Sequence, residues 1–193
     1  MSYARHGLAI TIFTVVVGFT LPAFAQGDEV PADKTPVVQA PDVKAEFQGK
    51  FVYAGGQKQR DKLVEAIEAA TDDMNFVTRP IARSRLKDTN IVFQSLVVAF
   101  TADTVSVKRD SQTPIATPIS GAKGTWTSPD DETYTVTQTL KDRKIVQTFV
   151  AGDGRKVATY TLSKDGKSLT LSISVSSPKL PQKVTYALSY RKS

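Results

Sequence analysis

From residue 90 to the carboxyl terminus, hydrophobic and polar residues alternate with a period of two, which is typical of strands with one buried and one wet face. Short segments rich in Gly and Asp interrupt the alternation at residues 141–143, 152–154 and 165–166. Gly and Asp accept the positive φ that tight hairpins need, so consecutive strands should pair antiparallel. The pattern predicts strands at 91–100, 103–109, 114–119, 123–127, 132–140, 144–151, 155–163, 168–176 and 182–191.

One further strand and two helices precede this region. Residues 47–53 alternate large apolar side chains with polar ones and stop at a pair of glycines, which predicts the first strand. Helical spacing follows over 57–73, and Pro80 suits the first turn of a second helix that ends near Lys87. A sheet of ten strands normally curls and closes. The predicted fold class is therefore all-β, an antiparallel meander barrel of about ten strands with a short helix pair after the first strand.

The first 25 residues read as a cleavable signal peptide. Arg5 precedes an apolar run from Leu8 to Leu21, and Pro22 then leads to Ala23-Phe24-Ala25, which fits a small-residue cleavage site. A transmembrane anchor is the alternative, but about 14 apolar residues fall short of the roughly 20 that a membrane helix needs. We expect cleavage near Ala25 and a secreted or periplasmic domain.

Residues 26–44 carry Pro31, Pro36 and Pro41 among polar residues, which predicts a disordered linker ahead of a barrel domain at 45–193. The chain has no Cys, and its one histidine, His6, lies in the predicted signal peptide. Thiol nucleophiles, histidine bases and Cys/His zinc sites are thus excluded from the mature domain. We expect no cofactor, no metal and no enzyme, although carboxylate, Lys or Tyr chemistry of an isomerase or cyclase type stays open.

The net charge of +6 comes from basic residues spread along the chain. A nucleic-acid-binding protein usually clusters them with interleaved aromatic residues, so no nucleic-acid partner is expected. A positive charge of this kind favours solubility and attraction to an anionic membrane surface.

Two segments resemble the lipocalin and fatty-acid-binding-protein superfamily, the calycins. Phe47-Gln48-Gly49-Lys50-Phe51 is similar to the opening Gly-x-Trp strand with Phe in place of Trp, and residues 144–149 followed by 152–156 resemble the late hairpin. The resemblance covers about 46–191 and implies a barrel that holds a lipid-like ligand. The last strand lacks the family's Arg-x-Tyr pair, and Tyr160 stands where such carriers often have an inward Arg, so their carboxylate clamp is not predicted.

Several polar residues share the predicted inner face of the barrel. The candidate ligand-binding set is Tyr134, Gln138, Gln147, Tyr160 and Tyr186 together with Arg83. Internal hydrogen bonding to neighbours and water is the alternative for the glutamines and Tyr160, because small barrels are commonly filled by side chains. Core packing with the hydroxyl at the rim is the alternative for Tyr186.

Basic residues recur at helical spacing on the second predicted helix. Arg79, Arg83 and Lys87 form one stripe, with Arg85 beside it. In the resembling family such helices form a portal that meets membranes or ligand head groups, whereas a solvated face is the alternative. Among these residues Arg83 is the candidate for a reach into the barrel.

These patterns predict an exported, monomeric, non-enzymatic barrel that binds a small apolar or amphipathic ligand such as a lipid. The alternative is a filled barrel that acts as a protein-interaction or inhibitor module of the cell envelope.

Overall fold

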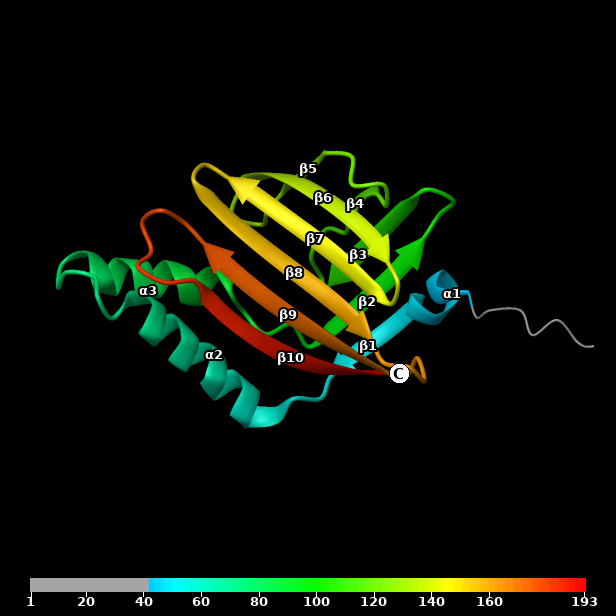
Figure 1. Cartoon of the computed structure of the whole chain (residues 1–193), viewed down its shortest axis with the longest axis horizontal. Coiled ribbons are helices and arrows are strands. Elements are labelled where there is room, and N and C mark those ends of the chain that lie inside the picture. The colour runs from blue at the N-terminus through cyan, green and yellow to red at the C-terminus, as the bar shows by residue number, and fades with distance from the viewer. Residues whose placement is uncertain (1–41) are drawn as a thin grey trace, which may run out of the picture. The chain divides into compact units, whose positions relative to one another are not determined.

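The computed structural model describes residues 42–193 and shows a ten-stranded antiparallel sheet with three helices (Figure 1). The predicted signal peptide and most of the predicted linker lie outside the described residues. The helices are α1 (Val43–Phe47), α2 (Gly56–Thr71) and α3 (Thr78–Thr89). The strands are β1 (Gly49–Tyr53), β2 (Ser95–Phe100), β3 (Thr104–Arg109), β4 (Ile115–Pro118), β5 (Gly124–Thr127), β6 (Thr133–Lys141), β7 (Lys144–Ala151), β8 (Gly154–Leu162), β9 (Ser168–Ser176) and β10 (Val184–Lys192).

The strands lie in the order β4-β3-β2-β1-β10-β9-β8-β7-β6-β5, and every neighbouring pair is antiparallel. This is a meander that curls until its two end strands approach each other. The predicted fold class, a nearly closed ten-stranded barrel with a helix pair after the first strand, is confirmed.

The end strands β4 and β5 are joined by contacts other than a regular ladder. An isolated bridge links Ser120 to Thr139, and the Gln138 side chain donates across the seam to Val105 O at 2.9 Å and Thr117 Oγ1 at 2.8 Å. Gly124 allows the close approach, because a Cβ there would lie 2.5 Å from Thr117 Cγ2. Side-chain hydrogen bonds therefore connect the two edges of the sheet where no regular backbone ladder joins them.

α1 corrects the expected start of the domain. The linker was predicted to run to residue 44 and the first strand to begin at 47, but residues 43–47 are helical and β1 begins at Gly49. The Asp42 carboxylate caps this helix by accepting from Lys44 N at 3.0 Å. Phe47 is fully buried, and Lys192 Nζ donates to Glu46 O at 2.6 Å. α1 thus closes the end of the barrel where β1 begins, an arrangement that depends on tertiary contacts.

Two other boundaries differ from the prediction. β2 begins at Ser95 rather than at residue 91, and α3 begins at Thr78, two residues before Pro80. Pro80 still lies in the first turn of α3, where its missing N–H costs no helical hydrogen bond.

Side chains fill most of the barrel. The buried apolar cluster includes residues from all the long strands, among them Phe51, Leu96, Val107, Ile145 and Leu188. α2 packs along β10, where Ser189 N donates to Gln59 Oε1 at 2.8 Å and Leu63 and Ile67 form a second buried cluster. Within residues 42–193, none of the helices has the length and apolar character that a membrane crossing requires.

Candidate ligand site at the barrel mouth

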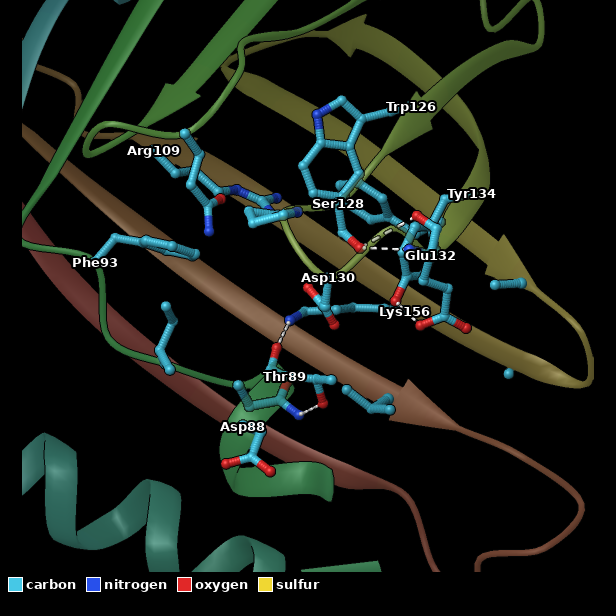
Figure 2. Close-up of a pocket in the computed structure, with 18 residues that line it drawn as sticks. Asp88, Thr89, Phe93, Arg109, Trp126, Ser128, Asp130, Glu132, Tyr134 and Lys156 are labelled. Carbon is cyan, nitrogen blue, oxygen red and sulfur yellow. Dashed lines mark hydrogen bonds between the residues drawn. The ribbon is translucent and has the colours of Figure 1, made fainter. Parts of the chain in front are cut away.

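A cavity of about 250 Å³ lies at the end of the barrel opposite α1. Its lining comes from the end of α3, the turn between β5 and β6, the turn-proximal ends of β7 and β8, and Arg109 at the end of β3. Figure 2 shows these side chains around one space. The alternation of inward and outward side chains that forms the core therefore also forms the cavity lining, since the last inward-facing residue of several strands reaches the cavity.

Arg109 is the most buried charged residue of this lining. Val105, Val107 and Arg109 alternate inward along β3, and Arg109 is only 6% exposed. Its Nη2 donates to Gln147 Oε1 at 2.6 Å and to Tyr160 Oη at 3.0 Å, while its guanidinium carbon lies 4.9 Å from the Phe149 ring centroid and 5.5 Å from that of Phe93. Its Nε is buried and has no hydrogen-bond partner. A buried cation with a free donor is suited to an acceptor from a ligand.

Below Arg109, three of the predicted site residues form one chain of hydrogen bonds. Gln147 Nε2 donates to Gln138 Oε1 at 2.7 Å, Tyr160 Oη donates to Gln147 Oε1 at 3.1 Å, and Gln138 reaches β3 and β4 as described above. All three side chains are fully buried, and none of them lines the cavity. The structure brings them together as an internal network that holds Arg109.

Aromatic rings form the apolar wall of the cavity. The rings of Trp126, Tyr134 and Phe149 pack against one another with centroids 5.8 to 6.0 Å apart. Tyr134, a predicted site residue, lines the cavity and donates its hydroxyl to Glu132 Oε2 at 2.5 Å. Burial, together with this carboxylate, raises the pKa of Tyr134, so its hydroxyl stays protonated. The wall is thus aromatic and uncharged.

Lys156 is the second cation that lines the cavity. It lies on the inward face of β8, with Ala158 and Tyr160 at the following inward positions, and its Nζ donates to Thr89 O at 2.9 Å. Burial, and secondarily the charge of Arg109, lowers the pKa of Lys156 to about 7. The amine therefore exists in both protonation states near neutral pH.

Two tyrosines of β10 fix the edge of the cavity instead of lining it. Tyr186, a predicted site residue, donates its hydroxyl to Asn90 Oδ1 at 3.2 Å, and Tyr190 donates to Phe93 O at 3.1 Å. Burial raises the pKa of both hydroxyls. These contacts hold the segment between α3 and β2, which carries Phe93 to the cavity.

Arg83 was predicted to reach into the barrel, but in the structure its side chain turns to the end of α2. Arg83 does not line the cavity; its Nε donates to Thr71 Oγ1 at 2.9 Å, and Nη2 lies 3.7 Å from Asp72 Oδ1. Arg79 donates from Nε and Nη2 to Met74 O at 3.1 and 2.8 Å. Both guanidinium groups complement the negative carboxyl end of α2, so only Lys87 of the predicted stripe is fully turned to solvent.

Sequence reasoning missed the two cations of the site. Arg109 follows Val105 and Val107 at a period of two, and Lys156 precedes Ala158 and Tyr160 in the same way. Extending the alternation forward along β3 to Arg109 and back along β8 to Lys156 would have placed both side chains inside the barrel.

No protein-family model and no curated protein matches this chain. Solved structures that it resembles include a REP1-NXSQ fatty acid transporter (14% identity, 77% of this chain and 97% of that one, TM-score 0.48). They also include lipid binding protein 8 of Caenorhabditis elegans (16%, 77% and 96%, 0.48) and a fatty-acid-binding protein from brain tissue of Drosophila melanogaster (15%, 76% and 99%, 0.48). By their names these neighbours are fatty-acid- and lipid-binding proteins. Likeness at this level assigns neither a family nor a ligand to the chain.

Proposed function

We propose that this chain is a non-enzymatic binding protein whose mouth cavity takes a small amphipathic ligand. The observation that carries the proposal is Arg109, a buried cation that lines an aromatic-walled cavity and whose Nε has no hydrogen-bond partner. A carboxylate or carbonyl oxygen of the ligand accepts from Arg109, and its apolar part lies against Trp126, Tyr134 and Phe149. Such a combination of an apolar wall and a few polar groups is typical of ligand pockets.

The size of the cavity limits the ligand. At about 250 Å³ it lies just below the roughly 300–1,000 Å³ of common ligand pockets. The filled interior below Arg109 leaves no room for a long chain to lie inside the barrel. The ligand is therefore either a small molecule or one end of a lipid whose remainder extends through the mouth.

Export is part of the proposal. The order of Arg5, the apolar run 8–21 and the Ala23-Phe24-Ala25 site supports cleavage near Ala25 and a monomeric protein that acts outside the cytoplasm. A His-free and Cys-free mature domain supports binding over catalysis.

Native mass spectrometry of protein purified from its own host tests this function. We expect a mass excess that disappears after extraction with organic solvent, with the released molecule carrying an acid or carbonyl group on an apolar body. The Arg109→Met variant, purified in parallel, should carry little of it. A wild-type protein that shows only the mass of the bare chain, with nothing in the extract, would contradict the proposal.

An interaction module is the second candidate, and one observation favours it. Phe76 and Val77, just before α3, and Ile81, in its first turns, are 86%, 58% and 55% exposed. Large apolar side chains that cluster in solvent often mark a contact surface. If this surface binds an envelope protein, Phe76→Ser combined with Ile81→Ser abolishes its capture without changing ligand content; capture that persists would exclude this surface.

Contact with an anionic membrane stays a prediction. Because Arg79 and Arg83 are bonded to α2, it would depend on Arg85 and Lys87, which are exposed. Vesicles that contain about one third anionic lipid should bind the wild type and release it as salt rises above the screening range of roughly 0.15 M.

A further inference from the structure

We propose that Lys156 captures small aldehydes or ketones in the mouth cavity as a reversible imine, an inference that rests on the binding function proposed above. The ligand class is then narrowed from amphipathic molecules in general to carbonyl compounds with an apolar, preferably aromatic, body.

Lys156 lies where a ligand would meet it. It is the outermost inward-facing side chain of β8, paired with Phe149 of β7 and Val175 of β9, and all three residues line the cavity. Figure 2 shows the side chain extended toward Thr89, whose carbonyl oxygen accepts its hydrogen bond. None of the three salt bridges among residues 42–193 includes Lys156. The amine therefore has to give up one hydrogen bond, and no ion pair, to meet a ligand.

The surroundings keep a large fraction of this amine neutral. Burial disfavours the charge of the Lys156 amine, and the positive charge of Arg109 on β3 adds to this effect, so its pKa is lowered. The acids facing it from other elements are Asp88 at the end of α3 and Asp130 and Glu132 at the turn before β6, with the Glu132 carboxylate already accepting from Tyr134. At pH 7 about half of the Lys156 amines are neutral, against roughly one in a thousand for an exposed lysine. A neutral lysine amine is the nucleophile of carbonyl chemistry.

Arg109 supplies the complementary group. Arg109 lines the cavity, and an N–H of its guanidinium can donate to the carbonyl oxygen of a bound aldehyde and polarise the C=O bond. The Lys156 nitrogen lone pair then forms a bond to the carbonyl carbon, and one amine proton passes to the oxygen to give a carbinolamine. Loss of that oxygen as water, with the second amine proton, leaves the C=N bond. One water is released for each imine, and no oxidant or reductant takes part.

A purely structural role for Lys156 is the competing explanation. Thr89 O is one of the last carbonyls of α3, which lack helical partners, and a lysine is a common cap for such a group. This role would tie α3 to β8 but would give the amine no unusual reactivity toward carbonyl compounds. Reactivity therefore separates the two explanations.

The test exposes the protein as purified from its own host to 3-phenylpropanal near pH 7, with and without cyanoborohydride, which reduces imines to stable amines. Fluorescence of Trp126, the only tryptophan of the chain, reports occupancy of the cavity. Peptide mass mapping reports which lysine is modified. Lys156→Arg and Lys156→Met are the test variants, and Lys144→Met, at an exposed position at the start of β7, is the matched control.

We expect Lys156 to be trapped on the order of a hundredfold faster than exposed lysines, in the wild type and in Lys144→Met alike. The rate should fall as the pH is lowered below about 7, and both Lys156 variants should lose this fast modification while Trp126 still reports binding. A fluorescence change without selective trapping would overturn the imine and leave the binding function standing. If neither a fluorescence change nor selective trapping occurred, both the imine and the binding function would be overturned.

Discussion

Arg109 Nη2 donates to Gln147 Oε1 at 2.6 Å across the inside of the barrel, from β3 to β7. The two residues are 6% and 0% exposed. The acceptor is shared, because Tyr160 Oη also donates to Gln147 Oε1 at 3.1 Å. The Gln147 amide, together with Tyr160 Oη, therefore holds Arg109, the one buried arginine among residues 42–193 and part of the cavity lining. This contact thus bears both on the stability of the barrel and on the proposed ligand site.

Replacing Gln147 should destabilise the barrel far more than replacing Arg109. Gln147→Leu leaves the buried Arg109 charge without its amide acceptor, and we expect a loss of about 3 kcal/mol in the free energy of unfolding, measured in urea. Arg109→Met removes the charge itself, and Gln147 Oε1 keeps its bond from Tyr160, so we expect a loss of about 1 kcal/mol or less. Equal losses in the two variants would contradict the assigned roles.

Gln138 of β6 should hold the end strand β4 in place across the seam of the barrel. Gln138→Leu removes the bonds to Val105 O and Thr117 Oγ1 and leaves Gln147 Nε2 without its acceptor. We expect a loss of about 2 kcal/mol in unfolding free energy and faster amide hydrogen exchange in β4 than in β9. Thr137→Ala, at a position of β6 that is not among the buried residues, serves as the control. Unchanged exchange in β4 would show that the seam does not depend on Gln138.

Lys156 should make stability depend on pH in the alkaline range. Its pKa is about 7 in the folded protein and about 10.4 when unfolded, so the unfolded chain binds more protons between these values. Stability should therefore rise with pH from about 7 toward about 10. Below about pH 7 the amine is charged in the folded protein as well, so the cost of burying that charge is then fully present. The Lys156→Met variant should lack this rise, whereas Lys144→Met should keep it. Parallel curves for the wild type and Lys156→Met would exclude the lowered pKa.

The contact of Glu46 with Arg143 should contribute to stability at neutral pH and lose that contribution in acid. The Arg143 guanidinium lowers the pKa of Glu46, so the folded protein binds this proton less readily than the unfolded chain does. The stabilisation is present above the ordinary glutamate pKa of about 4.3 and disappears as the pH falls through the lowered folded value. The thermal midpoint of Glu46→Gln should thus lie below that of the wild type at pH 7, with the gap narrowing in acid. Glu68→Gln, on the exposed face of α2, should match the wild type throughout.

Strand alternation made most of the fold predictable. Each strand from β3 to β10 keeps a period of two, and the turns at residues 141–143, 152–154 and 165–166 contain the Gly or Asp that hairpins need, including Asp142 at φ 53° and Gly166 at φ 70°. Local rules of this kind decide which face of a strand is buried. They do not decide where α1 lies, because its five residues are held by distant groups such as Arg143 and Lys192.

The candidate site was less predictable, for a related reason. Gln138, Gln147 and Tyr160 were placed inside correctly, but whether they face a ligand or one another depends on the register that sets Gln138 opposite Gln147. Arg83 has the spacing of a residue that could turn inward, yet the carboxyl end of α2 provides nearer acceptors. Arg109 was missed because the inward alternation of Val105 and Val107 was not extended to the last residue of β3.

Calorimetric titration with 3-phenylpropanoate, a small apolar carboxylate, tests the mouth cavity most directly. The wild-type protein should bind one molecule with a saturating isotherm, and Arg109→Met should weaken that binding at least tenfold, about 1.4 kcal/mol, while Arg155→Met, on the outer face of β8, leaves it unchanged. Absence of saturable binding to the wild type, or equal binding to the Arg109→Met variant, would contradict the assignment of this cavity as the ligand site.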